Sequence, residues 1–198
     1  AEYFPNTVDR QEIDRALIEY IKSKVKVNGK IINVFVRKYD TDFKKVTKPC
    51  VSVYVTGFTK DPTRQSPFGT EIVLGKDKVN KTVSMQKSGT AVEYTYSIDF
   101  WSDTQSEFNI MTEQWLLSSS FSKWFNLPVK DSKGLDTTLL CLERTGVISQ
   151  TEVEENKEAD NYRLFHSSQV YSIYTYYEGE VYDAPMVTDV SFDTEVLK

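Results

Sequence analysis

The sequence has very little of the residue types on which most catalytic and metal sites depend. It contains one histidine, His166, and two cysteines, Cys50 and Cys141, in 198 residues. A single histidine excludes every metal site built from paired histidines, including the HExxH arrangement. The cysteines stand far apart between apolar neighbours and form no CxxC pair, so we expect two buried, reduced thiols. The alternative, a nucleophile and base pair of Cys141 and His166, has no further support in the sequence.

Glycine and long apolar runs are also scarce. With 8 scattered glycines there is no GxGxxG or GxxxxGK[ST] motif, which excludes the usual phosphate-binding loops. No run approaches the roughly 20 apolar residues of a membrane span, and the N-terminus lacks a signal-peptide layout, so we expect an intracellular chain without membrane contact. The carboxylates of 152–160 lie in a polar stretch that we interpret as a solvated linker. We therefore expect no enzyme, no cofactor and no metal ion.

Positive charge is in deficit, with 24 Lys and Arg against 29 Asp and Glu and a net charge of −5. Affinity for nucleic acids comes largely from Lys and Arg on phosphates, so this balance disfavours a dedicated nucleic-acid binder. A nucleic-acid-binding module stays an alternative because lysines gather at 22–30 and 44–48, with aromatic residues between them. An acidic surface would also suit a channel through which DNA slides.

The hydrophobic pattern predicts one α+β domain over residues 1–198. Aromatic residues make up 13% of the chain, including 12 Tyr and 11 Phe, which favours extensive strand surface. Apolar residues recur every four positions in 8–25 and again after Ser102-Asp103, which predicts two amphipathic helices, the second ending before Pro128. Alternating segments predict strands at 30–37, 51–56, 91–101, 137–142, 145–150 and 163–177, with 91–101 central.

This order of elements favours a mainly antiparallel sheet flanked by two helices. Residues 57–88 contain Asp-Pro, Ser-Pro and Phe-Gly turns and predict a long hairpin or loop that projects from the body. The tail, 178–198, still alternates but carries Pro185 and several acids. It is either a last edge strand or an arm added to a neighbour's sheet.

A tyrosine-rich strand runs directly into the second helix as EYTYSIDFWSDTQSEFNIMTEQWLL (93–117), and FNLPV (125–129) follows. In this order of elements the chain resembles bacteriophage tail-terminator proteins and related neck, or head–tail joining, proteins. The resemblance implies a small α+β domain that forms a ring, usually a hexamer, at the end of the tail tube. The ring joins tail to head without catalysis.

The same resemblance implies the partners. They are further copies of the chain, the tail tube, sheath and connector proteins of a phage particle, and genomic DNA that passes through the ring without specific binding. It also implies a place in the virion after assembly in the host cytoplasm. The region after Glu152 is longer than a minimal terminator needs, so another neck, baseplate or tube-associated subunit is an alternative.

A ring requires a patch on one subunit that fits a different patch on the next. Three residues in the expected projection, Pro67, Phe68 and Ile72, are apolar in otherwise polar surroundings. We expect them to anchor the contact against the sheet near Tyr174 and Tyr176.

Overall fold

The computed structural model describes residues 5–36, 46–64, 71–118, 123–144, 149–157 and 160–187, with side chains omitted for 149–157 and 160–163. Its helices are α1 (Arg10–Lys24) and α2 (Gln105–Ser118). The described strands are β1 (Lys26–Val27), β2 (Lys30–Ile31), β3 (Asn33–Val36), β4 (Cys50–Lys60), β5 (Glu71–Asp77), β6 (Thr82–Lys87), β7 (Thr90–Ser102), β8 (Trp124–Lys130), β9 (Asp136–Glu143), β10 (Ser149–Lys157), β11 (Asp160–Tyr177) and β12 (Val181–Pro185).

A curled sheet in the order β3-β4-β7-β11-β9-β8 forms the body, and β10 pairs with β11 beside it. Strands β3 and β4 run parallel, and the other neighbours in this sheet run antiparallel. The predicted α+β class with a mainly antiparallel sheet is confirmed. The predicted central position of 91–101 is also confirmed, because β7 lies between β4 and β11.

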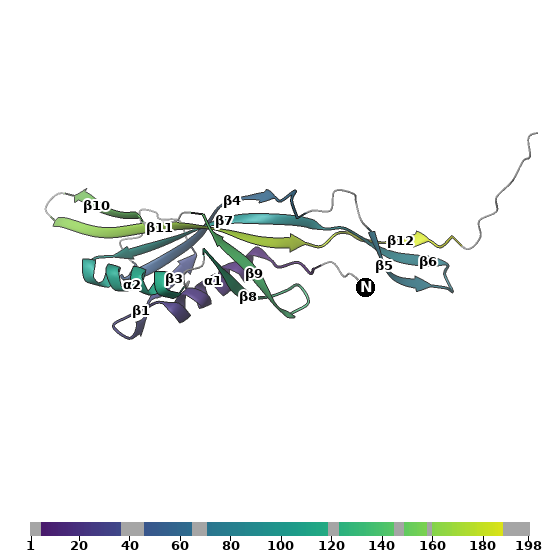
Figure 1. Cartoon of the computed structure of the whole chain (residues 1–198), viewed down its shortest axis with the longest axis horizontal. Coiled ribbons are helices and arrows are strands. Elements are labelled where there is room, and N and C mark those ends of the chain that lie inside the picture. The colour runs from purple at the N-terminus through teal and green to yellow at the C-terminus, as the bar shows by residue number, and fades with distance from the viewer. Residues whose placement is uncertain are drawn as a thin grey trace, which may run out of the picture.

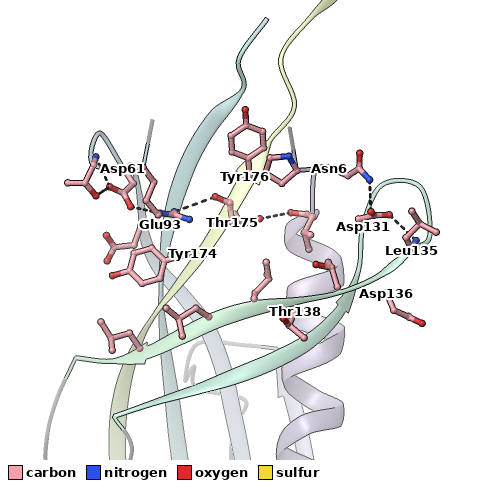
Figure 2. A pocket seen from close by; sticks show the side chains of 18 residues that line it. Asn6, Asp61, Glu93, Asp131, Leu135, Asp136, Thr138, Tyr174, Thr175 and Tyr176 are labelled. Carbon is pink, nitrogen blue, oxygen red and sulfur yellow. Dashed lines mark hydrogen bonds and ion pairs between the residues drawn. The ribbon is translucent and has the colours of Figure 1, made fainter. Parts of the chain in front are cut away.

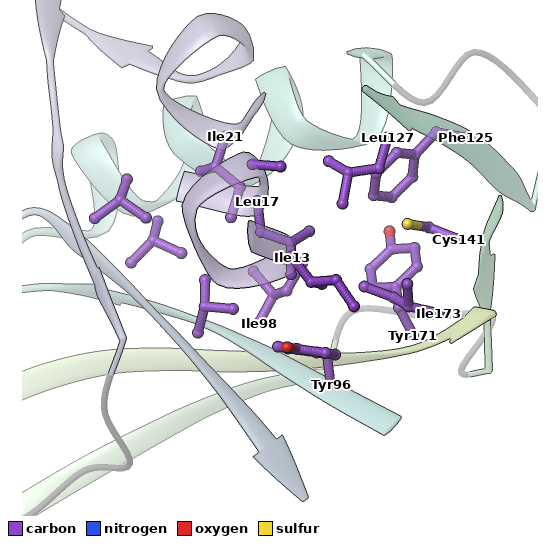
Figure 3. Packing of buried hydrophobic residues seen from close by; sticks show 14 of the residues in the cluster. Ile13, Leu17, Ile21, Tyr96, Ile98, Phe125, Leu127, Cys141, Tyr171 and Ile173 are labelled. Carbon is purple, nitrogen blue, oxygen red and sulfur yellow. The ribbon is translucent and has the colours of Figure 1, made fainter. Parts of the chain in front are cut away.

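Both helices lie on the same side of this sheet, and the core fills the space between (Figure 1). Helix α1 presents a stripe of fully buried side chains at four-residue spacing, Ile13, Leu17 and Ile21. They meet the inward residues of the sheet and of the β8–β9 hairpin, which curls around α1 (Figure 3). The sheet residues drawn there with labels are Tyr96, Ile98, Phe125, Leu127, Cys141, Tyr171 and Ile173.

Helix α2 closes the core with an aromatic side chain that is also hydrogen-bonded. Trp115 is 1% exposed and packs edge-on against Phe125 and Tyr171. Its Nε1 donates a hydrogen bond of 2.7 Å to Oε1 of buried Gln169 on β11. A buried indole N–H without a partner would destabilise the fold, so this bond fixes the position of the helix against the sheet.

The strands β12-β6-β5 form a separate antiparallel sheet, here called the arm. It continues the direction of β7 and β11 and extends away from the end of the body opposite to β10 (Figure 1). Residues 57–60 of the expected projection belong to β4, and the hairpin itself runs from Glu71 to Lys87. In the tail, residues 181–185 pair with β6 of the same chain, and 188–198 lie outside the described residues.

Two glycines allow the body to pass into the arm. A Cβ at Gly89 would overlap the carbonyl oxygen of Tyr177, and one at Gly179 would overlap the carbonyl oxygen of Lys87. The two chain segments therefore cross here with their backbones in direct contact, which only glycine permits. This crossing sets the direction in which the arm leaves the body.

The second helix begins later than expected and ends, as expected, before Pro128. Strand β7 continues through Ser102 because Ser102 pairs with Phe165 of β11, so Thr104 caps the helix instead of Ser102 or Asp103. Thr104 Oγ1 accepts from the N–H of Glu107 at 3.4 Å and donates to Glu107 Oε2 at 3.1 Å, and the N–H of Thr104 donates to Ser102 Oγ at 3.2 Å. The helix ends at Ser118, and Pro128 lies in β8, an edge strand where proline is tolerated.

The expected acidic linker at 152–160 is wrong. Residues 149–157 form β10, which pairs with the first part of β11 from Ser149 opposite Ser168 to Lys157 opposite Asp160. The ladder of backbone hydrogen bonds holds this hairpin, and such a ladder tolerates charged side chains. Among the described residues, neither helix is long and apolar enough to cross a bilayer.

Two leucines, one buried and one exposed, test the packing of the core. Leu17 is fully buried on α1, whereas Leu117 on α2 is 80% exposed. We expect Leu17→Ala to lower the free energy of unfolding by about 2–5 kcal/mol, because it leaves a cavity against the sheet. Leu117→Ala should stay within about 0.5 kcal/mol of the wild type. Urea unfolding of both variants measures this, and equal losses would contradict the packing described.

Candidate functional site

An open groove of about 1010 Å³ lies where the sheet separates into two parts (Figure 2). Strand β9 pairs with β11 only at residues 171–173 and then turns away from it. One wall of the groove is therefore β9 with the loop before it, and the other is β11 around Tyr174 to Tyr176. Residues 5–8, before α1, and 61–64, after β4, complete the lining.

The segment before α1 is tied into the groove by hydrogen bonds of its backbone and of threonine hydroxyls. The carbonyl oxygen of Thr7 accepts from the N–H of Ser132 at 2.7 Å, and Thr7 Oγ1 accepts from the N–H of Glu178 at 2.8 Å. Thr175 Oγ1 donates to the carbonyl oxygen of Val8 at 3.4 Å. Three regions far apart in sequence therefore share one rim.

Arg64 forms the base of one side of the groove. Its Nη2 donates to the carbonyl oxygens of Val92 at 2.9 Å and Thr175 at 3.4 Å, and its guanidinium lies 4.7 Å from the ring centre of Tyr174. Nε donates to Asp61 Oδ2 at 2.6 Å. These contacts join the loop after β4 to β7 and β11. The guanidinium of Arg64 also holds the ring of Tyr174 through a cation–π contact.

Glu93 on β7 is a second carboxylate in the lining. It is paired with Arg144, and Ser172 Oγ donates to its Oε1 at 2.6 Å. Burial raises the pKa of Glu93, but the hydrogen bonds from Ser172 and Arg144 outweigh it and leave the pKa below its ordinary value. Glu93 is therefore charged at neutral pH.

The loop between β8 and β9 adds two more carboxylates. Asp131 accepts from Asn6 Nδ2 at 2.6 Å and from the backbone N–H groups of Lys133 and Leu135, each at 2.9 Å. The hydrogen bond from Asn6, ahead of the other contacts, lowers the pKa of Asp131. Asp136 is paired with Lys130 at 2.8 Å and its side chain is 88% exposed. The rim thus carries carboxylates, and hydrogen-bond donors and cations of the same chain hold them in place.

Between these carboxylates the groove is apolar. Leu140 is 42% exposed and Leu135 is 60% exposed, and both line it with Tyr174 and Tyr176. Exposed leucines beside tyrosines and carboxylates suit an extended protein surface with apolar and basic side chains. Among the described residues, no three His, Cys, Asp or Glu side chains gather in a way that could hold a metal ion.

A second polar cluster lies on the sheet face opposite the helices, around Asp99. Its Oδ1 accepts from Ser97 Oγ and Ser168 Oγ, both at 2.7 Å, and its Oδ2 lies 3.6 Å from His166 Nε2. The ring of His166 stacks on Trp101 with centres 3.8 Å apart. Both serine hydroxyls point to the carboxylate and neither to the imidazole, so the cluster lacks the serine–base contact of a nucleophilic site.

The cysteines are free and buried, as expected. Cys141 lies in the helix-side core opposite Ile173, whereas His166 lies on the other face of the sheet, so the two cannot form a catalytic pair. Burial raises the pKa of the Cys141 thiol, and it raises that of Cys50 to about 12. Neither is a thiolate at neutral pH.

The residues expected at an interface are placed as follows. Tyr174 and Tyr176 share one face of β11 and both line the groove. Ile72 is half-buried on β5 of the arm, opposite Gln86. Pro67 and Phe68 lie outside the described residues. The expected contact between these two sets joins different copies of the chain and stays a prediction.

Sequence reasoning missed the charged half of the groove. Asp61 enters the sequence prediction only through its Asp-Pro turn, and Glu93 only as the first residue of the segment 93–117. Asp61, Glu93 and Asp131 are separated by more than 30 residues each and belong to no motif. No local signal could have brought them together.

The pKa of Asp61 tests the groove's hydrogen bonds. The hydroxyl of Thr63, followed by Arg64, lowers this pKa to about 2 from 3.8. A carboxyl whose pKa is lower in the folded than in the unfolded chain stabilises the fold at pH values above its unfolded pKa. This stabilisation is lost as the pH falls through the folded pKa. We expect Thr63→Val to raise the pKa of Asp61 and to reduce the acid sensitivity of stability below about pH 4. Carboxyl NMR titration measures this; an unchanged Asp61 pKa, or an equal change at Asp131, would contradict it.

The fold has counterparts among solved structures. No family model matches the chain, and no curated protein matches it. Eighteen chains of solved structures do match. One is described as "Cryo-EM Structure of an Extracellular Contractile Injection System, PVC sheath/tube terminator in extended state", with a TM-score of 0.53 and 14% identity. The match covers 98% of this chain and 66% of that one, so this chain spans less than two thirds of its length. At this identity the likeness establishes a shared fold.

Proposed function

We propose that the chain is a non-enzymatic structural subunit that ends the tube of a phage tail, or of a related tail-like particle, as a ring. The observation that carries this is the similarity of fold to a sheath/tube terminator over 98% of the chain, with body and arm included. The resemblance of residues 93–117 to tail terminators points to the same family independently of the structure.

The arm supports a role in assembly. It is a single three-stranded sheet outside the body, and the described helices do not cover it (Figure 1). Val73, Leu74 and Val181 on it are 53%, 45% and 54% exposed. A small sheet without a second layer is marginally stable alone, and a projection with exposed apolar residues is typical of contact between proteins.

The partners follow from this role. Further copies of the chain form the ring, which we expect to be a hexamer, and the last tube and sheath subunits lie on one side of it. In a phage the connector lies on the other side, joining tail to head, and DNA passes through the lumen without specific binding. The place of action is the virion, after assembly in the host cytoplasm. The net charge of −5 supports this over a nucleic-acid-binding module.

The oligomeric state tests the proposal. We expect the purified chain to associate with increasing concentration and to reach a fixed mass in light scattering, because a closed ring stops further addition. Negative-stain electron microscopy of the same samples should show rings.

Tube and sheath proteins from the same particle provide the second part of this test. The chain should bind one end of preformed tubes and stop their elongation, while an exposed-surface variant, Leu117→Asp, should behave as the wild type. A chain that stays monomeric and does not bind tube ends would contradict the proposed function.

A further inference from the structure

The turn at the outer end of the arm presents the most exposed apolar side chain among the described residues. Val79 is 89% exposed, and it lies between the ends of β5 and β6. Lys76, Lys78 and Lys81 surround it and are exposed as well. An exposed valine within a group of lysines has no role in the fold of this chain, because it packs against none of the core.

Asp77 holds this turn in one shape. Its Oδ1 accepts from the N–H groups of Val79 at 2.8 Å and Asn80 at 3.1 Å, and its Oδ2 accepts from Asn80 Nδ2 at 2.7 Å. The hydrogen bonds from Asn80, the main cause, keep the pKa of Asp77 below its ordinary value. The carboxylate is therefore used inside the turn, and the three lysines are exposed. A turn that is ordered before binding loses less conformational entropy when it docks.

The groove has the complementary chemistry. Its lining holds four carboxylates, from Asp61, Glu93, Asp131 and Asp136, and one guanidinium, from Arg64. Each of the four has a cation of the same chain beside it: Arg64 pairs with Asp61, Arg144 with Glu93 and Lys130 with Asp136, and Lys133 acts on Asp131. The pair of Lys130 and Asp136 is exposed to solvent and therefore weak, which leaves Asp136 open to a competing cation. Glu178 lies at the same rim and accepts from the hydroxyl of Ser132 at 3.3 Å.

The exposed leucines of the groove match the exposed valine of the turn. Leu135 and Leu140 lie between the acidic side chains, and each leaves much of its surface to solvent. A basic turn with an apolar centre therefore fits a groove with an apolar floor and an exposed carboxylate, Asp136, at its rim. Opposite charges around an apolar contact select the partner and its register.

The turn cannot reach the groove of its own chain. The groove is lined by Tyr174 to Tyr176, at the end of β11 from which the chain passes into the arm. The turn between β5 and β6 lies at the far end of the arm (Figure 1). From Tyr176 to Pro185, which pairs at the end of β6 next to the turn, the chain extends for about 30 Å at about 3.3 Å per residue. The two surfaces can meet only between copies. Such a contact joins two different patches, one on each of two copies, and a contact of this kind can generate a closed ring.

We propose that the turn 76–81 of one copy docks in the groove of the next, with Val79 against Leu140 and the lysines against Asp136 and its acidic neighbours. This inference rests on the proposed self-assembly and names the surfaces that perform it. It differs from the contact expected from the sequence, because the tip of the arm, rather than Pro67, Phe68 and Ile72, faces Tyr174 and Tyr176.

Charge exchange between the two surfaces tests the inference. In the full-length chain, Lys78→Asp and Asp136→Lys should each weaken association by at least about tenfold, because each places like charges together. The double variant should recover most of the loss, since it restores opposite charges in exchanged positions. Val79→Asp should weaken association similarly. The controls are Lys30→Asp and Leu117→Asp, which change exposed residues of the body and should leave association unchanged.

The outcomes separate this inference from the proposed function. All substituted side chains are exposed, and thermal unfolding checks that each variant is folded. Single losses with recovery in the double variant support docking of the turn in the groove. Rings that form equally well with Lys78→Asp and Val79→Asp would overturn it and leave the ring intact. Single losses without recovery would also overturn the pairing. A wild-type chain that never associates, even at tube ends, would overturn the proposed function and this inference with it.

Discussion

The antiparallel pairing of β7 with β11 is the interaction on which the rest of the structure depends. All 13 residues of β7 pair with β11, from Thr90 opposite Tyr177 to Ser102 opposite Phe165. One face of this pair supplies the inward tyrosines and isoleucines against which the helices pack. Beyond Gly89 and Gly179 the same two segments continue as β6 and β12. The body and the arm are therefore parts of one long ribbon.

The groove exists because β9 leaves this ribbon after three residue pairs. If β9 stayed paired along β11, the backbone edges near Tyr174 and Tyr176 would be covered and the side chains of Leu140 and Glu93 would not share a space. Instead β9 turns with β8 around α1, where Phe125, Leu127 and Cys141 join the core. Burial of these residues stabilises the curl of the sheet, and the open groove is its consequence.

Much of the fold was predictable because its signals are local. The stripe of Ile13, Leu17 and Ile21 specified α1, and the alternation of Tyr94, Tyr96, Ile98 and Phe100 specified the strand that became β7. The errors occurred where a distant partner decided. Ser102 stays in β7 because it pairs with Phe165, and the acidic stretch after Ser149 is a strand because β11 lies beside it. The groove shows the same division: Tyr174 and Tyr176, whose place at an interface stays a prediction, line it together with Asp61 and Arg64, which no local pattern singles out.

The sequence by itself determined the α+β class, the two amphipathic helices, the scarcity of residues for metal and nucleophilic sites and the acidic balance, since composition and periodicity are properties of neighbouring residues. Only the tertiary structure decided that β9 diverges from β11, that the chain crosses at Gly89 and Gly179, and that Asp61, Glu93, Asp131 and Leu140 share one groove. These features depend on pairings between residues far apart in the chain. Such pairings are selected by the free energy of the whole fold, and no short segment carries a signal for them.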